Sequence, residues 1–309
     1  MRIAFVFPGQ GSQSVGMLSG FAGNATVEGV LARADAALGF SISNLIAEGP
    51  AETLGLTVNT QPAMLAASVA FYEAWRAAGG RTPDVTAGHS LGEYSALTAA
   101  GVFTLEDAVR LVRFRAEAMQ SAVPVGTGGM AAVIGLSDDE VLAACEEARA
   151  VGAVEAVNFK APGQVVGAGE KAALARAIEC VKARGARRAI ELPVSAPFHS
   201  SLLKPAAEQL AKRLAETQVS VPTLPVIANV DAELHTTPDA IRAKLAAQAA
   251  SPVQWVKTIE RMKAEGVTDV VECGPGKVLV GLVRRIAPEM NLHSINDQAS
   301  LDALIQKLA

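Results

Sequence analysis

Apolar positions along the chain fall into two recurring arrangements. Short uninterrupted apolar runs, such as residues 3–7, are typical of strands buried on both faces of a sheet. Longer stretches with apolar residues at helical spacing predict helices, such as 62–78, in which Pro62 would occupy the first turn. Strands are expected again near 226–229 and 268–272. This alternation of strands and helices predicts a mainly parallel sheet covered by helices on both faces.

The middle of the chain departs from that alternation. After a glycine-rich segment, the pattern predicts six elements: a strand at 130–134, a helix capped by Ser137 and Glu140 that reaches about residue 150, strands at 154–158 and 164–168, a helix at 171–184 and a strand at 189–193. That β-α-β-β-α-β order is typical of a ferredoxin-like unit. We therefore expect a small ferredoxin-like domain at 126–194, inserted in a large α/β domain made of 1–125 and 195–309.

The composition limits the classes of protein to consider. Of the 309 residues, 50% are hydrophobic and 19% are charged, which supports a sizeable buried core rather than disorder. The net charge of −4 argues against a nucleic-acid partner. The three cysteines form no C-x-x-C pair, so neither a disulfide framework nor a metal site is indicated. The apolar N-terminal run is too short for a signal peptide, and no stretch reaches membrane-spanning length, so we expect a cytoplasmic protein without a membrane partner.

One pentapeptide, Gly88-His89-Ser90-Leu91-Gly92, matches the G-x-S-x-G pattern of nucleophilic serines. A short extended run precedes it, and a helix-forming stretch follows it. In that setting the serine lies at a helix N-terminus, where free backbone N–H groups can bind an anion. Ser90 is therefore the candidate nucleophile. The alternative is a simple tight turn that needs two glycines.

A serine hydroxyl is a weak nucleophile until a base accepts its proton, and histidine is the usual base. His89 adjoins the serine, but neighbouring residues on a tight turn point in different directions, so we expect it to be a pocket wall. His235 lies in a polar loop and is expected to be solvated, whereas His293 lies in a short C-terminal segment. His199 follows the segment that leaves the small domain, which places it at the cleft between domains, where ligands bind. We take His199 as the base; the alternative is a role in capping the next helix.

Arg115 lies where a charge is unexpected. The helix that Thr104 opens presents Ala108 and Met119 on an apolar face, and at about 100° per residue Arg115 falls on that face too. A buried unpaired charge is costly, and no acidic residue of this helix shares the face. A guanidinium binds a carboxylate through two parallel hydrogen bonds. The position indicates a site for an exogenous carboxylate, with an internal salt bridge to a distant acid as the alternative.

Two glycine-containing segments follow predicted strands. Segment 8–13 lies at the carboxyl end of the first strand, where open α/β sheets bind ligands. It is not a dinucleotide fingerprint, but it can offer backbone N–H groups to an oxyanion, together with the N–H of Leu91. Segment 274–277 lacks the spacing of a phosphate loop, so we expect a strand-to-helix turn there.

Taken together, these segments resemble the malonyl-CoA:acyl-carrier-protein transacylase family of fatty-acid synthesis. The resemblance runs from residue 3 to beyond residue 280, so it covers essentially the whole chain. The segments that carry it are Phe5-Val6-Phe7-Pro8-Gly9-Gln10-Gly11-Ser12-Gln13, Gly88-His89-Ser90-Leu91-Gly92-Glu93-Tyr94, Asn158-Phe159 with Pro162-Gly163-Gln164-Val165-Val166, Leu192-Pro193-Val194-Ser195, His199-Ser200 and Gly274-Pro275-Gly276-Lys277-Val278-Leu279.

The resemblance implies a hydrolase-like α/β large domain with a ferredoxin-like insert, in agreement with the fold class expected from periodicity. The family uses no triad carboxylate, and the resemblance implies no metal and no tightly bound cofactor. Phe198, directly before the base, indicates little room for a substituent on the malonyl α-carbon. The roles implied for the matching residues are Ser90 as nucleophile, His199 as base, Gln248 as the residue whose backbone carbonyl orients His199, Gln10 and Leu91 as oxyanion-hole amides, Arg115 as the malonyl clamp, and His89, Phe198 and Asn158 as further substrate contacts.

The reaction that the resemblance implies is an acyl exchange in two steps. Malonyl-CoA would acylate the serine, and the phosphopantetheine thiol of an acyl carrier protein would then take the malonyl group. We expect the enzyme to act as a monomer. Because the carrier is expected to be acidic, a basic dock should rim the cleft, and the candidates are Lys182, Arg184, Arg187, Arg188, Lys277, Arg284 and Arg285.

Other functions share these residues. In an ordinary serine esterase or thioesterase the histidine lies near the C-terminus, so His293 with Asp269 would serve Ser90, but Arg115 would then have no purpose. A malonyl-transfer subunit of a malonate decarboxylase and a discrete polyketide acyltransferase perform the same exchange in other pathways. An inactive carrier-binding homologue is a further alternative, and it would form no adduct on the serine.

Overall fold

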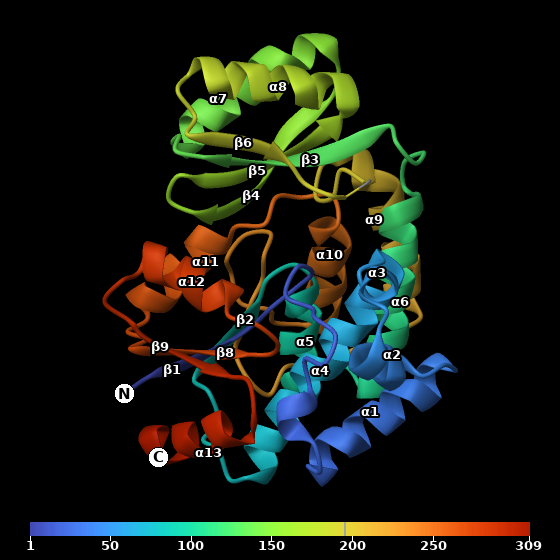
Figure 1. The fold of residues 1–309 in the computed structure, drawn as a ribbon, viewed down its shortest axis with the longest axis vertical. Helices are drawn as coiled ribbons and strands as arrows, with labels where there is room; N and C mark the ends of the chain where they lie inside the picture. The colour runs from blue at the N-terminus through green and yellow to red at the C-terminus, as the bar shows by residue number, and fades with distance from the viewer. Residues whose placement is uncertain (195) are drawn as a thin grey trace.

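Five parallel strands form the larger of two sheets (Figure 1). The computed structural model describes residues 1–194 and 196–309; Ser195, in the segment that leads to His199, lies outside the described residues. The strand order is β7-β2-β1-β8-β9, and each pair of neighbours is parallel, as the alternation of elements predicted. The bounds are β1 Ile3–Phe7, β2 Val85–Gly88, β7 Val226–Ile227, β8 Asp269–Cys273 and β9 Asn291–Ile295.

The central strand β1 supplies side chains to two different cores, because successive residues of a strand point to opposite faces. Ile3, Phe5 and Phe7 pack with one group of helices, and Ala4 and Val6 pack with the other. The first group contains α1 Ala25–Leu38, α4 Thr57–Ala77, α5 Leu91–Ala99 and α6 Leu105–Ser121, and the second contains α11 Trp255–Ala264 and α12 Val278–Ile286. Apart from α7 Asp138–Ala148 and α8 Lys171–Ala183, the other helices are α2 Ile42–Glu48, α3 Ala51–Leu54, α9 Lys204–Ala215, α10 Pro238–Gln248 and α13 Gln298–Leu308. Short 3-10 turns lie at Ser19–Phe21, Arg149–Val151 and Ser201–Leu203.

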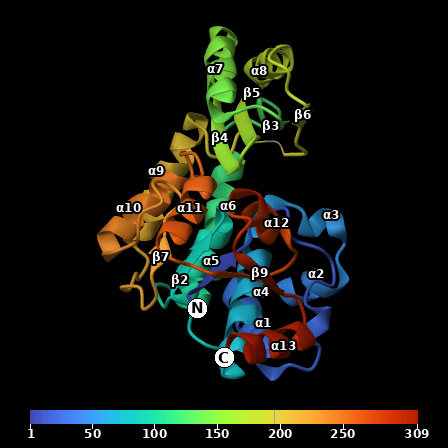
Figure 2. The same ribbon diagram turned by 90° about the vertical axis from the view of Figure 1, so that its left-hand side faces the viewer.

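The second sheet is antiparallel, with the strand order β4-β5-β3-β6. It lies at one end of the molecule with α7 and α8 packed on its outer face (Figure 2). Its elements follow the predicted β-α-β-β-α-β order, so the expected fold class is confirmed, whereas the domain limits at 126–194 stay a prediction. They are β3 Gly128–Ile134, α7 Asp138–Ala148, β4 Val154–Ala161, β5 Gln164–Glu170, α8 Lys171–Ala183 and β6 Arg188–Glu191.

Helix α4 begins five residues before the helix expected at 62–78, so the prediction that Pro62 lies in the first turn is wrong. The residues that precede Pro62 are mostly weak helix formers, which concealed the first turn. The hydroxyl of Thr60 stabilises that turn, because it donates to the carbonyl oxygens of Leu54 at 2.6 Å and Leu56 at 3.1 Å. None of the helices in the described part of the chain combines the length and the apolar character that crossing a bilayer requires.

A buried carboxylate holds the start of α12. Glu272, at the carboxyl end of β8, accepts hydrogen bonds from the backbone N–H groups of Leu279 at 3.1 Å and Val280 at 2.9 Å. Burial raises the pKa of Glu272 from 4.5 to about 7, and these two backbone N–H groups only partly oppose the shift.

Glu272→Gln should therefore change how the free energy of unfolding depends on pH. The folded state holds the Glu272 proton more tightly than the unfolded state does, so this group's contribution is greatest below its ordinary pKa of 4.5 and is lost as pH rises to about 7. Denaturant unfolding of both proteins at several pH values should show wild type losing stability relative to the variant across that window, by on the order of 2–3 kcal/mol. Parallel curves would contradict the assignment.

Candidate active site

Ser90 occupies a strained turn between β2 and α5. Its φ of 52° and ψ of −110° are rare for a residue with a side chain, and such strain concentrates at functional sites. The two glycines of the pentapeptide are needed for space. A Cβ on Gly88 would lie 1.8 Å from the carbonyl oxygen of Gly92, and a Cβ on Gly92 would lie 2.0 Å from that of Phe7. The turn therefore needs both glycines and also exposes a strained serine, so the two interpretations of the motif are compatible.

Asn229 holds this turn from the opposite side. Its Oδ1 accepts a hydrogen bond from the backbone N–H of Ser90 at 2.7 Å, and its Nδ2 donates to the carbonyl oxygen of Gly88 at 2.7 Å. The side chain is fully buried. Sequence reasoning missed this residue, because nothing in the sequence connects it to a serine 139 positions earlier.

The serine, a histidine and a backbone carbonyl form one line of hydrogen bonds. Ser90 Oγ lies 2.8 Å from His199 Nε2, and His199 Nδ1 lies 2.8 Å from the carbonyl oxygen of Gln248. Because a carbonyl can only accept, Nδ1 carries the proton and Nε2 is left as the acceptor for the serine hydroxyl. Burial, followed by the charge of Arg115, lowers the pKa of His199 to about 4, so the ring is neutral at pH 7. The side chain points at Ser90, which excludes the helix-capping alternative.

Arg115 lies beside the serine and is 1% exposed, on the buried face of α6 as predicted. Its Nη2 donates to Gln248 Oε1 at 2.7 Å and to Ser90 Oγ at 3.2 Å, and its Nη1 donates to Gln61 Oε1 at 2.8 Å. The guanidinium also lies 5.2 Å from the ring centre of Tyr94. Within 1–194 and 196–309 none of its hydrogen-bond partners is a carboxylate, so the internal salt bridge considered as the alternative does not form there.

Gln10 and Leu91 are the two residues predicted to offer backbone N–H groups to an oxyanion. Gln10 and Leu91 line the same cavity as the serine. The close approach of the loop after β1 to this turn depends on Gly9, where a Cβ would lie 2.5 Å from the carbonyl oxygen of His89 and 3.7 Å from the N of Leu91. Such paired amides are the usual donors to the negative oxygen of a tetrahedral intermediate.

These groups open into a cavity of about 510 Å³ between the two sheets. Phe198 and Asn158 line it, as expected. His89 is a wall residue, as expected, because its Nε2 lies 3.0 Å from Asn158 Oδ1 rather than near the serine hydroxyl. Burial, and then the charge of Lys160, lower the pKa of His89 to about 3, so it is neutral too. Lys160 is a cavity residue that the sequence reasoning missed, and burial lowers the pKa of its ammonium group.

The two remaining histidines are bound elsewhere. The prediction that His235 is solvated is wrong: it is 5% exposed, and its Nε2 lies 2.6 Å from Glu93 Oε1, because the polar loop folds back onto β7. His293 does pair with Asp269, with 2.8 Å between Nε2 and Oδ1. However, Asp269 begins β8, whereas Ser90 follows the end of β2. Because the strands are parallel, Asp269 lies where the strands begin and Ser90 lies where they end. The esterase alternative therefore lacks its histidine.

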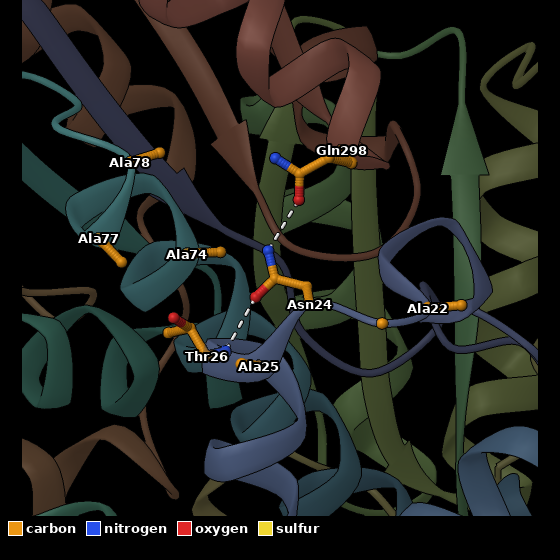
Figure 3. A pocket seen from close by; sticks show the side chains of 9 residues that line it. Ala22, Asn24, Ala25, Thr26, Ala74, Ala77, Ala78 and Gln298 are labelled. Carbon is orange, nitrogen blue, oxygen red and sulfur yellow. Dashed lines mark hydrogen bonds between the residues drawn. The ribbon is translucent and has the colours of Figure 1, made fainter.

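A second cavity of about 460 Å³ lies near the N-terminus of α1 (Figure 3). Alanines form much of its wall, and the side chains of Asn24 and Gln298 are already hydrogen-bonded. Asn24 Nδ2 donates to Gln298 Oε1 at 2.7 Å, and Asn24 Oδ1 accepts from the N–H of Thr26 at 3.0 Å. None of its lining residues is titratable. Within the described residues, no group of three His, Cys, Asp or Glu side chains is arranged to hold a metal ion.

Comparison with known proteins agrees with this geometry. A protein from Escherichia coli K12 named malonyl CoA-acyl carrier protein transacylase is 52% identical over 306 residues, which cover 99% of each chain. A crystal structure of an acyl-carrier-protein S-malonyltransferase from Burkholderia pseudomallei is 57% identical with a TM-score of 0.98, and the match covers 99% of this chain and 100% of that one. A malonyl-transacylase solved in complex with its type II PKS acyl-carrier protein is 46% identical, with a TM-score of 0.98 and the same coverage. Residues 4–304 match the acyl transferase domain family, and the chain belongs to that family as an acyltransferase.

Proposed function

We propose that this enzyme transfers the malonyl group of malonyl-CoA to the phosphopantetheine thiol of an acyl carrier protein, through a malonyl ester of Ser90. The proposal rests mainly on Arg115, a buried cation beside the serine. The hydrogen-bond partners of Arg115 are two neutral amides and one hydroxyl. A carboxylated acyl group supplies the anion that this position lacks. The names of the relatives, which are malonyl transacylases, support the same substrate.

In the first half-reaction, His199 Nε2 accepts the proton of the Ser90 hydroxyl as the oxygen attacks the thioester carbonyl. The backbone N–H groups of Gln10 and Leu91 bind the oxyanion that forms. The C–S bond then breaks, and the CoA sulfur leaves with the proton that His199 had taken. The carbonyl oxygen of Gln248 keeps the imidazole oriented throughout, because its bond to Nδ1 persists in both protonation states.

In the second half-reaction, the carrier thiol attacks the malonyl-serine ester. His199 takes the thiol proton and returns it to the Ser90 oxygen as the ester bond breaks. A single covalent intermediate shared by two half-reactions predicts ping-pong kinetics. Throughout the cycle Arg115 would hold the malonyl carboxylate, and an acyl chain without that carboxylate would leave the guanidinium unpaired. Phe198, part of the cavity wall, supports a preference for malonyl over methylmalonyl groups.

The carrier protein is proposed to bind at the basic rim of the cleft. All seven basic candidates are exposed, but Lys182 and Arg184 lie at the end of α8, on the face of the small sheet away from the cavity, which leaves the other five as candidates for the rim. Arg184 pairs with Glu147 at 3.0 Å, and Arg285 donates to the carbonyl oxygen of Pro162 at 2.8 Å. We propose that the product feeds fatty-acid synthesis, and that the enzyme works as a cytoplasmic monomer without a cofactor or nucleic acid. Comparing fatty-acid and polyketide carrier proteins as acceptors tests the pathway.

Mass spectrometry of the acyl-enzyme tests the nucleophile and base. Mixing wild type with malonyl-CoA should add one malonyl group on Ser90, and Ser90→Ala should abolish it. His199→Ala should slow the loading at least about a hundredfold, because it removes the general base. His293→Ala is the control and should load at the wild-type rate. Absence of any adduct on the wild-type protein would contradict malonyl transfer and favour an inert carrier-binding homologue.

Arg115→Ala tests the clamp. Malonyl loading should fall roughly a hundredfold, because a buried charge pair with the substrate is lost. Acetyl loading from acetyl-CoA should be spared or should rise, because the acetyl group has no carboxylate to bind. Stopped-flow or quenched acylation with the two thioesters in parallel measures both rates. An equal loss with malonyl and acetyl groups would contradict a carboxylate clamp.

A further inference from the structure

A buried carboxylate lies directly behind the nucleophilic turn. Glu93 belongs to α5, three residues after Ser90, and is 1% exposed. Its Oε1 lies 2.6 Å from His235 Nε2. Its Oε2 accepts from the side-chain amide of Gln248 at 2.7 Å and from the backbone N–H of Asn229 at 3.2 Å. The mechanism above gives this residue no task.

The hydrogen bonds show which form of Glu93 the site is built for. The amide of Gln248 and the backbone N–H of Asn229 can only donate, so Oε2 must accept both hydrogen bonds. An ionised carboxylate also accepts from the ring N–H of His235, which fits the ε tautomer, since His235 Nδ1 has no hydrogen-bond partner in the described structure. Glu93 is thus a buried anion held by three donors.

Glu93 and the carbonyl oxygen of Ser90 together determine which way the amide of Gln248 faces. Gln248 Nε2 lies between two acceptors, Glu93 Oε2 and the carbonyl oxygen of Ser90 at 3.0 Å, so this end must be the NH₂ group. Gln248 Oε1 is thereby directed at Arg115, from which it accepts at 2.7 Å. The backbone carbonyl of the same glutamine orients His199. One residue therefore positions both the base and the carboxylate clamp, and Glu93 positions that residue.

Glu93 also balances the charge of the site. Arg115 is a buried cation: burial lowers the pKa of its guanidinium, and Tyr94 and then the negative charge of Glu93 oppose that shift. Burial, and then the charge of Arg115, lower the pKa of His199, which must become an imidazolium as the serine attacks. The other cation of the cavity, Lys160, and the neutral His89 add no negative charge. Glu93 is therefore the buried anion that partly offsets the charge of Arg115.

We propose that Glu93, held by His235, is a positioning residue for acyl transfer: it aligns Gln248 so that Arg115 and His199 face the acyl group and Ser90 together. The inference rests on the proposed function, because its measure is the rate at which the serine is acylated. Because Gln248 positions the base as well as the clamp, loss of Glu93 should slow acetyl loading too, whereas loss of Arg115 should spare it.

Glu93→Gln tests the proposal, because it keeps the size of the side chain and removes its charge. The single-turnover acylation rate should fall about tenfold with malonyl-CoA and should also fall with acetyl-CoA, since a charge-assisted bond to the aligning amide is lost. The KM for malonyl-CoA should rise, because Gln248 no longer holds Arg115 toward the substrate carboxylate. A variant that was merely less well folded would lose active enzyme without raising KM.

His235 provides a rescue test that does not depend on the stability of the first variant. His235→Gln keeps an N–H donor for Glu93 and should acylate at close to the wild-type rate. His235→Ala leaves one carboxylate oxygen unpaired and should acylate several times more slowly than His235→Gln. Glu272→Gln is the matched control for losing a buried carboxylate, since its contacts are to α12 rather than to the site, and it should not raise the KM for malonyl-CoA.

Two results would overturn the proposal while leaving malonyl transfer intact. One is that Glu93→Gln keeps the acylation rate and the KM of the wild-type protein, or that Glu272→Gln shows the same changes in rate and KM. The other is equal rates for His235→Ala and His235→Gln. Failure of the wild-type protein to form a malonyl adduct on Ser90 would instead reject the proposed function, so the two failures are distinguishable.

Discussion

The buried positive charge of Arg115 is the constraint on which the rest of the site depends. A guanidinium removed from water must be surrounded by acceptors, and here these are two glutamine amides and the serine hydroxyl. Such neutral partners bind both Nη atoms without neutralising the guanidinium, whereas its Nε has no hydrogen-bond partner in the described residues, so the cavity keeps a positive potential at the place where an acyl group is bound. Burial, and then the same positive charge, lower the pKa of His199 and keep the ring neutral and ready to accept a proton. Selectivity therefore shares one of its physical causes with base catalysis.

The fold assembles this arrangement by bringing several elements together where the strands of the parallel sheet end. The nucleophilic turn follows β2, the clamp comes from α6, and the orienting carbonyl ends α10. The last carbonyls of a helix have no partner within the helix, which is why Gln248 can offer its own to His199. A carbonyl in place of the usual triad carboxylate keeps the imidazole in the correct tautomer without adding an anion beside the malonyl carboxylate.

Local sequence patterns predicted much of this protein, and the reasons for the failures are specific. Continuous apolar runs, capping residues and glycine spacing located β1, β2, β7 and β8, the small antiparallel sheet and the turn around Ser90, but not the edge strand β9. Helical periodicity placed Arg115 on a buried face before any partner was known. The start of α4 was missed because its first turn depends on Thr60 and not on intrinsic helix propensity. His235 was placed in solvent because a polar loop normally is, whereas here one histidine meets a buried carboxylate.

The order of amino acids specifies which chemical groups are present and which face of its own helix or turn each one occupies, because these follow from neighbours a few positions away. How the groups meet depends on contacts between distant parts of the chain. Asn229 bonds to a turn 139 positions earlier, and Glu93 reaches Gln248 across 155 positions. Such contacts depend on how the chain returns to the sheet edge after each crossover, and no local pattern encodes that path. Five residues were therefore enough to predict the nucleophile, whereas no local segment could predict how its base and clamp are aligned.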